Sequence, residues 1–266
     1  MTDDVLARIM ADKAREVARA KKRIPLAALE QEITQTGPVR GFIRALTARA
    51  FGGGPAIIAE MKRASPSRGV LRYDLDPASV AQGYELAGAT ALSVLTDEIY
   101  FRGSAQDLKA AREACGLPVL RKDFMLDTYQ IAESRALGAD CVLLIVAALS
   151  EAQLCELFAA SKAYGLDALI EVHDARELAI ALALEGGLIG INNRDLKTFV
   201  TSIDTTIDLM SAIPSGRLVV SESGIASRHD VLRLKAAGLR GFLVGEAFMV
   251  AQDPGKGLIQ LFEGWL

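Results

Sequence analysis

The sequence predicts a closed (β/α)8 barrel, an α/β fold, preceded by an N-terminal helical extension. Short apolar runs recur eight times after residue 56, and a helical pattern follows each run. Apolar strands that alternate with helices are typical of a parallel sheet covered by helices. Eight such units in about 210 residues fit a closed barrel better than an open doubly wound sheet. The first run also lacks a following G-x-G-x-x-G motif, which argues against a dinucleotide-binding fold.

The composition limits the classes of function. Of the 266 residues 51% are hydrophobic and 24% charged, which allows a sizeable core. The net charge of −3 gives no support for nucleic-acid binding, so we expect a small-molecule ligand. Three cysteines and two histidines show no metal-ligand spacing, and we expect no metal. The N-terminus has no signal-peptide pattern and the longest apolar run, 141–149, is too short for a membrane span, which predicts a cytoplasmic protein without a membrane partner.

The N-terminal residues have a helical pattern of their own. A helix is expected over residues 3–22, with basic residues on one side and an apolar stripe on the other: Val5, Leu6, Ile9, Met10 and Val17. A second helix is expected near residues 26–35, before Gly37-Pro38, and residues 52–55 break the chain. We therefore predict one barrel domain over residues 1–266, with residues 1–50 as its helical extension.

The repeating units define strands and helix ends. Strands are expected at 57–62, 91–95, 119–122, 141–146, 168–172, 188–192, 218–222 and 241–245. Glycine stands where a helix needs a left-handed residue after its end, at Gly88, Gly116, Gly138, Gly165, Gly186 and Gly238. Asp127, Ser150 and Asp174 each stand three residues before Gln or Glu, which predicts capping boxes at the starts of three helices.

Polar residues end five of these strands, at the end of the barrel where active sites of this fold lie. They are Glu60 with Lys62, Lys122, Glu171, Asn192 and Glu222. The period of two in a strand places each of them on the same face as apolar neighbours. Strand ends are often polar because they meet solvent, but so many charged or amide ends converging on one mouth favour a catalytic site. The strand at 141–146 differs, and its Leu143, Ile145 and Val146 predict an apolar wall.

Small residues follow the last two strands, as expected of a barrel phosphate site. They are Ser223 and Gly224 after the seventh strand, and Gly245, followed by Glu246, after the eighth. Glu246 would contribute its backbone alone. The polar loop 63–69 is expected to act as a lid, so that Lys62 and Ser65 meet the phosphate from the other side. His173 follows Glu171 by two residues, but the residues after it show no ligand pattern, and it is interpreted as a loop histidine.

The motifs that carry this chemistry resemble those of the indole-3-glycerol phosphate synthase family. In chain order they are IIAEMKRASPSRG, LSVLTDEIYFRGS, PVLRKDF, ADCVLLIVAAL, ALIEVHD, IGINNRDL, VSESGI and FLVGEAF. The resemblance runs from the N-terminal helix to the end of the chain. It implies a (β/α)8 barrel with an extra N-terminal helical segment, no metal or organic cofactor, and a lyase of tryptophan biosynthesis. That reaction closes the ring of carboxyphenylamino-deoxyribulose phosphate, releasing carbon dioxide and water.

The resemblance also implies roles for the polar strand ends. Lys122 and Lys62 match the general acid and the cation that holds the carboxylate or phosphate, and the sequence does not decide which lysine acts in which step. Glu171 would be the base, or would stabilise positive charge on the aniline nitrogen. Glu60 and Asn192 would orient the sugar hydroxyls and the leaving water. Glu222 would complete this catalytic network.

The resemblance places the substrate's two ends as well. Phosphate-binding positions are matched by Lys62, Ser65, Ser223, Gly224, Gly245 and Glu246. The apolar slot for the anthranilate ring is matched by Pro66, Phe101, Phe124 and Leu143. Arg194 matches a loop arginine with a supporting role in substrate binding.

Three other functions compete with this interpretation. An isomerase of phosphoribosyl anthranilate would share the phosphate loops but has no need for the set of ionisable strand ends. An aldolase could use Lys122 to form a Schiff base with a carbonyl substrate. A barrel without catalytic activity could bind a phosphorylated ligand as a regulatory subunit, although binding alone gives no reason to gather so many charges in one mouth.

Overall fold

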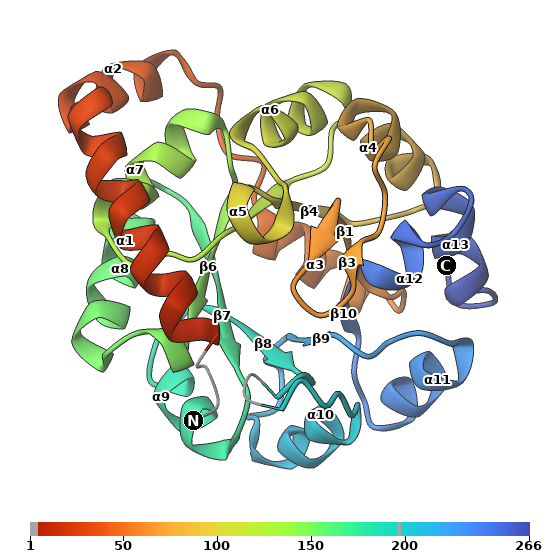
Figure 1. Cartoon of the computed structure of the whole chain (residues 1–266). Coiled ribbons are helices and arrows are strands. Elements are labelled where there is room, and N and C mark those ends of the chain that lie inside the picture. Colours follow the sequence, from red (N-terminus) through yellow and green to blue (C-terminus); the bar gives the residue numbers. More distant parts are fainter. Residues whose placement is uncertain (1–4, 196–197) are drawn as a thin grey trace.

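The computed structural model describes residues 5–195 and 198–266, and these residues form a closed parallel barrel of eight strands (Figure 1). In chain order the strands are β1 (Ala56–Met61), β4 (Ala91–Leu95), β5 (Val119–Lys122), β6 (Cys141–Ile145), β7 (Asp167–Val172), β8 (Leu188–Asn192), β9 (Val219–Glu222) and β10 (Gly241–Val244). Each strand pairs with the next, and β10 closes the barrel on β1 with Phe242 opposite Ile57. The predicted fold class is confirmed, and the predicted strand ends are within a residue of those observed.

Helices surround the barrel and connect its strands (Figure 1). The longer ones are α4 (Pro77–Leu86), α6 (Ala105–Ala114), α7 (Thr128–Leu137), α8 (Glu151–Ala163), α9 (Ala175–Leu182), α10 (Asp204–Leu209), α11 (Arg228–Ala236) and α13 (Pro254–Leu261). Shorter elements are α5 (Glu98–Phe101), α12 (Glu246–Met249), the 3-10 turns η1 (Val146–Ala148) and η2 (Met210–Ala212), and a hairpin of β2 (Ala64–Ser65) and β3 (Gly69–Val70). Within the described ranges, no helix is both long and apolar enough to cross a membrane.

Most of the predicted helix ends are confirmed. Gly88, Gly138, Gly165, Gly186 and Gly238 have positive φ values between 72° and 92°. The prediction for Gly116 is wrong, because α6 ends in an extended residue and Gly116 instead donates its N–H to the Glu85 carboxylate at 2.8 Å. Capping boxes form at Asp127 and Ser150.

The third predicted capping box is only half formed. Asp174 accepts the backbone N–H of Glu177, as expected. The Glu177 carboxylate, however, accepts the backbone N–H of His173 rather than that of the cap residue. The side chain of Glu177 is therefore available to a histidine that lies next to the barrel mouth.

Alternate residues of the strands separate two apolar layers. One set faces the helices and includes Ile57, Val142 and Ile170. The other set faces the barrel interior and includes Ile58, Leu120, Leu143, Leu169 and Val220. Two residues after such interior positions come Glu60, Lys122, Glu171 and Glu222, so the period of two directs these charges into the barrel at its carboxyl end. The predicted sharing of one face by charged and apolar neighbours is confirmed.

A helix that the sequence did not resolve individually closes the opposite end of the barrel. This is α3 (Phe42–Phe51), whose buried Phe42, Leu46 and Ala50 belong to the interior apolar layer. Phe42 and Leu46 have no exposed surface. Apolar packing thus fills the amino-terminal end of the barrel, and the polar groups gather at the carboxyl end.

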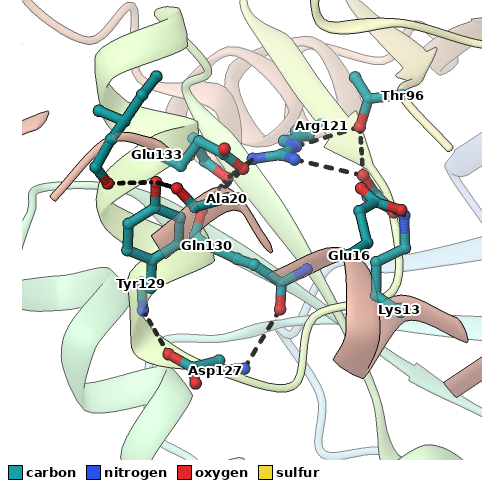
Figure 2. Close-up of polar contacts among 12 residues, drawn as sticks. Lys13, Glu16, Ala20, Thr96, Arg121, Asp127, Tyr129, Gln130 and Glu133 are labelled. Carbon is teal, nitrogen blue, oxygen red and sulfur yellow. Dashed lines mark hydrogen bonds and ion pairs between the residues drawn. The ribbon is translucent and has the colours of Figure 1, made fainter. Parts of the chain in front are cut away.

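The first two helices lie along α7 (Figure 1). They are α1 (Val5–Arg23) and α2 (Leu26–Gln35), close to the predicted ranges, with residues 3 and 4 of the prediction outside the described residues. Val17 and Leu29 pack against Tyr129 of α7. The Tyr129 hydroxyl also donates to the carbonyl oxygen of Ala20 at 3.2 Å (Figure 2).

One basic residue of α1 contradicts the predicted division into apolar and basic sides. Lys13 lies between Ile9 and Val17 on the buried stripe and is only 1% exposed. Its Nζ is 2.9 Å from Asp97, which caps α5, and 2.8 Å from Asp123, which follows β5. Figure 2 shows Lys13 of α1 beside the polar cluster around Arg121. An internal ion cluster therefore docks α1 over the carboxyl end of the barrel.

Candidate active site

A cavity of about 470 Å³ opens at the carboxyl ends of the barrel strands. Every residue to which the sequence assigned a catalytic, substrate-binding or phosphate-binding role lines it. These residues are Glu60, Lys62, Ser65, Pro66, Phe101, Lys122, Phe124, Leu143, Glu171, Asn192, Arg194, Glu222, Ser223, Gly224, Gly245 and Glu246. The structure thus brings the predicted set together in one place, while the role of each residue stays a prediction.

Lys122 stands at the polar centre of the cavity. Its ammonium group contacts the Glu222 carboxylate directly and lies 3.6 Å from Oε2 of Glu171. At the end of β1, Nζ of Lys62 donates to Oε1 of Glu60 at 2.6 Å. Three carboxylates and two ammonium groups therefore share one partly enclosed space, with one more negative than positive charge when all are ionised.

Burial and mutual attraction set the protonation of these groups. Burial disfavours the ammonium form of Lys122, but the three surrounding carboxylates raise its pKa above the usual range. Burial likewise opposes ionisation of Glu60, yet the Lys62 and Lys122 ammonium groups hold the pKa of Glu60 below its usual value. Burial raises the pKa of Glu222 to about 7, since the opposing effect of Lys122 is offset by the other two carboxylates.

Glu222 is therefore the carboxyl group of this site that exchanges a proton near neutral pH. Its Oε1 is buried and makes no hydrogen bond to any described residue. An unpartnered buried oxygen is available to a ligand hydroxyl, because bonding to it would remove a desolvation penalty.

Two glycines, which have no side chain, provide the space that two of these carboxylates occupy. A Cβ atom at Gly190 of β8 would lie 2.3 Å from Oε1 of Glu222. A Cβ atom at Gly245, after β10, would lie 2.4 Å from Oε1 of Glu60. The predicted importance of Gly245 concerned a phosphate, and Gly190 was not predicted at all. Both glycines admit a charged side chain into the barrel wall.

The loop after β9 is held in an uncommon backbone conformation. Ser223 and Gly224 have φ values of 65° and 74°. Nδ2 of Asn193 donates to the carbonyl oxygen of Ser223 at 2.9 Å and to Oγ of Ser221 at 2.8 Å. A turn of this kind can leave backbone N–H groups free to meet an anion. Asn193 therefore supports this loop.

The polar loop after β1 forms the β2–β3 hairpin, which closes over one side of the cavity. Arg68 at its turn lies 2.8 Å from Oε1 of Glu246. Arg194 contacts the hydroxyl of Ser67 and lies 3.6 Å from Oε2 of Glu246. The Glu246 side chain is therefore turned away toward two arginines, as expected if its backbone alone faces a phosphate.

The opposite side of the cavity is apolar. Phe101 and Phe124 face each other with ring centroids 6.2 Å apart, and Leu143 and Ile145 lie below them in β6. Val146, predicted to join this wall, belongs instead to the outer apolar layer, because β6 ends at Ile145 and the chain turns into η1. Helix α1 adds Val5, Leu6 and Ile9, which sequence analysis did not assign to the site. The apolar stripe of α1 was the signal that could have found them.

His173 lies in the loop after β7, as the sequence predicted, and it has two partners that the sequence did not indicate. Its Nε2 lies 3.4 Å from Oε1 of Glu171. Its Nδ1 lies 2.9 Å from Oε2 of Glu177. The spacing of His173, two residues after Glu171, was the available signal.

The fold and the site together define a class. A closed parallel barrel with acids and ammonium groups converging at the carboxyl ends of its strands has the architecture of a (β/α)8-barrel enzyme. Comparison with known structures agrees on the fold. Thiamine phosphate pyrophosphorylase from Pyrococcus furiosus superposes with a TM-score of 0.59 at 18% identity, covering 79% of this chain and 95% of its own.

Comparison of sequences identifies the family within that class. The model of the family described as indole-3-glycerol phosphate synthase matches residues 6–261. A protein of that name from Acidithiobacillus ferrooxidans is 54% identical over 97% of this chain and 98% of its own length. Another from Albidiferax ferrireducens is 55% identical over the same shares of the two chains. The chain belongs to the indole-3-glycerol phosphate synthase family.

Proposed function

We propose that this protein is a carbon–carbon lyase that converts 1-(o-carboxyphenylamino)-1-deoxyribulose 5-phosphate into indole-3-glycerol phosphate, carbon dioxide and water. The observation that supports it best is the position of Lys122. Its ammonium group lies between the carboxylates of Glu171 and Glu222, at the boundary between the apolar wall and the loop after β9. A substrate with an aromatic acid at one end and a phosphate at the other would place its ketone at that boundary.

The reaction has a definite proton balance. The aromatic carbon that bears the carboxylate attacks the ketone carbon, and the ketone oxygen takes a proton. Carbon dioxide then leaves, and its bonding electrons restore the aromatic ring. The new hydroxyl leaves as water after taking a second proton, while one proton is lost from the neighbouring carbon or nitrogen. The site must therefore supply two protons and remove one in each turnover.

The geometry suggests how the residues divide this work. Lys122, kept as an ammonium group by its carboxylate neighbours, is suited to protonate the ketone oxygen. Lys62 holds the carboxylate or phosphate and can serve as the acid of the other step. Glu171 accepts the proton that is lost, or stabilises charge on the aniline nitrogen. Glu222, with a pKa of about 7 and a free Oε1, can donate to the leaving hydroxyl.

The remaining site residues hold the two ends of the substrate. Glu60 and Asn192 orient the hydroxyls. The phosphate lies against Lys62, Ser65, Ser223, Gly224, Gly245 and the backbone of Glu246. The anthranilate ring lies against Pro66, Phe101, Phe124 and Leu143. Arg194 links the hairpin to the phosphate side of the cavity.

The alternative of a Schiff-base aldolase is disfavoured by the surroundings of Lys122. A lysine that attacks a carbonyl must be unprotonated, which requires a lowered pKa. The carboxylates around Lys122 have the opposite effect and raise its pKa. The same charges distinguish the site from a phosphate-binding barrel without catalytic activity, which would gain nothing from holding them together.

The proposal also covers the domain organisation, the class of ligand and the cellular location. We infer one barrel domain with residues 1–50 as its extension, acting on a small phosphorylated molecule and not on nucleic acid. A cytoplasmic location is supported by unpaired cysteines, since Cys115, Cys141 and Cys155 are all free.

Fluorescence of the indole product tests the proposal. We expect turnover of the carboxyphenylamino sugar phosphate by the wild-type protein. Lys122→Ala should lower kcat by about 10²–10⁴-fold with ligand binding retained, because a general acid contributes about that much. Lys109→Ala, at an exposed lysine of α6, is the matched control and should leave kcat unchanged. A folded wild-type protein that binds the substrate without converting it would refute the proposal.

A further inference from the structure

His173 lies just after the carboxyl end of β7, behind the Glu171 carboxylate and outside the cavity lining. Its side chain is 12% exposed, and Nε2 lies 3.4 Å from Oε1 of Glu171. The same Oε1 accepts from Nδ2 of Asn192 at 3.2 Å, whereas Oε2 faces the Lys122 ammonium group at 3.6 Å. Glu171 is therefore held on one oxygen by His173 and Asn192 and presents the other oxygen to Lys122.

The histidine ring is itself held in place. Oε2 of Glu177 accepts the backbone N–H of His173 at 2.8 Å and lies 2.9 Å from Nδ1 of the same residue. A carboxylate at Nδ1 favours a proton there and leaves Nε2 as the nitrogen that faces Glu171. Because Glu177 makes these contacts, it does not accept the backbone N–H of Asp174, as a complete capping box of α9 would require. Nε2 is buried and makes no hydrogen bond within the described residues, so its contact with Glu171 is that of an ion pair.

A further cation suits this site, because the proposed substrate brings negative charge to it. Glu60, Glu171 and Glu222 outnumber Lys62 and Lys122 by one charge when all are ionised, and the charges match when Glu222 is protonated. The groups that face His173 are both carboxylates, Glu171 on β7 and Glu177 on α9. Burial opposes the imidazolium form, but these two carboxylates raise the pKa of His173 to about 10. In turn, the contact with His173, together with Lys122, outweighs burial and lowers the pKa of Glu171.

We propose that His173, oriented by Glu177, is a positioning residue that holds the Glu171 carboxylate ionised and turned toward Lys122. This inference rests on the proposed function for its effect on turnover. Without the imidazolium group, Glu171 would lose one of its two supports and the adjacent positive charge. The pKa of Glu171 would then rise, and its side chain would no longer be held beside Lys122. Both changes would impair the removal of the substrate proton.

The ion pair can be tested without activity, because the chain has just two histidines, His173 and His229. We would follow the imidazole nitrogens of the wild-type protein by NMR, assigning them with His229→Asn. His173 should stay protonated through pH 8. In Glu171→Gln and in Glu177→Gln its pKa should fall by about one unit or more, because each change removes a facing carboxylate. A wild-type His173 that titrates near pH 6.5 would overturn the inference.

Kinetics test the positioning role itself. His173→Ala should lower kcat about tenfold with little change in KM, since a misplaced reacting group affects the chemical step. The acidic limb of its kcat profile should move to higher pH, because Glu171 without a neighbouring cation is protonated sooner. His173→Asn keeps a hydrogen-bond donor without the charge, and should recover part of kcat but not the position of the limb. His229→Asn, at an exposed site on α11, is the matched control.

The outcomes separate this inference from the proposed function. Folded His173 variants with the wild-type kcat and pH profile would overturn the positioning role, and so would a change confined to KM. Absence of turnover in the wild-type protein would refute the proposed function instead, while the NMR titration would still decide whether His173 and Glu171 form an ion pair.

Discussion

Replacing Lys13 by methionine tests whether the buried ion cluster docks α1 on the barrel. Lys13 is 1% exposed, and the Asp97 and Asp123 side chains beside it are 2% and 1% exposed. Lys13→Met fills the same space but leaves both carboxylates with a missing cation, and Arg121 remains near just one of them, 3.3 Å from Asp123. Breaking a buried ion pair from one side destabilises a protein by about 3–5 kcal/mol. We expect a loss of unfolding free energy in that range.

The assay is urea unfolding followed by circular dichroism, with Lys21→Met as the control. Lys21, also in α1, pairs at the surface with Asp127, the N-cap residue of α7, and the two side chains are 46% and 27% exposed. Such pairs contribute about 0–1 kcal/mol. Equal and small losses in the two variants would refute the structural role of the Lys13 cluster.

The pH dependence gives a second measure of the Lys13 contribution. Despite the opposing effect of burial, the carboxylates raise the pKa of Lys13 above that of a free lysine. A group whose pKa is raised by folding stabilises the folded state fully below its pKa in the unfolded chain, which is about 10.4 for lysine. That stabilisation is lost as the pH rises through the pKa of the folded state. The difference in stability between wild type and Lys13→Met should therefore stay constant from pH 6 to pH 9.

Two more predictions concern Glu222. Folding raises the pKa of Glu222 to about 7, so between the ordinary carboxyl pKa and pH 7 the folded state holds a proton that the unfolded state releases. The free energy of unfolding should therefore fall as the pH rises through this range. Glu222→Gln should flatten this slope in urea titrations at pH 5–8, and an unchanged slope would contradict the assignment. Gly190→Ala should lower kcat by about 10–100-fold, because a Cβ atom 2.3 Å from Oε1 must displace Glu222 from Lys122. Gly83→Ala, where a Cβ atom meets nothing within 4 Å, is the control, and equal effects of the two glycine substitutions on kcat would contradict this explanation.

Most of the fold and the polar strand ends of the site followed from periodicity, whereas Pro66, Phe101, Phe124 and Arg194 were expected from the family resemblance. The alternation of residues in a parallel strand determines which side chains face the interior, so Glu60, Lys122 and Glu171 could be assigned to one mouth before any coordinates. The order of the strands around the barrel did not have to be known, because the carboxyl ends of all parallel strands lie at the same rim.

What escaped sequence analysis depends on contacts between distant segments. Lys13 resembles any other basic residue of an amphipathic helix until Asp97 and Asp123 are brought beneath it. His173 lies two residues after Glu171, but its function depends on Glu177, which the spacing assigned to a capping box. Gly116 has the position of a helix-ending glycine, and the approach of Glu85 determines its conformation instead. In each case tertiary contacts override a correct local preference.

The closure of the barrel by α3 has a consequence for the route of substrate and products in a catalytic cycle. Phe42 and Leu46 fill the amino-terminal end, so the cavity above them is a blind well. The proposed substrate would therefore enter, and all three products would leave, through the opening at the carboxyl-end rim. The β2–β3 hairpin borders that opening and is joined to Glu246 by the ion pair of Arg68, while Arg194 pairs with the same carboxylate.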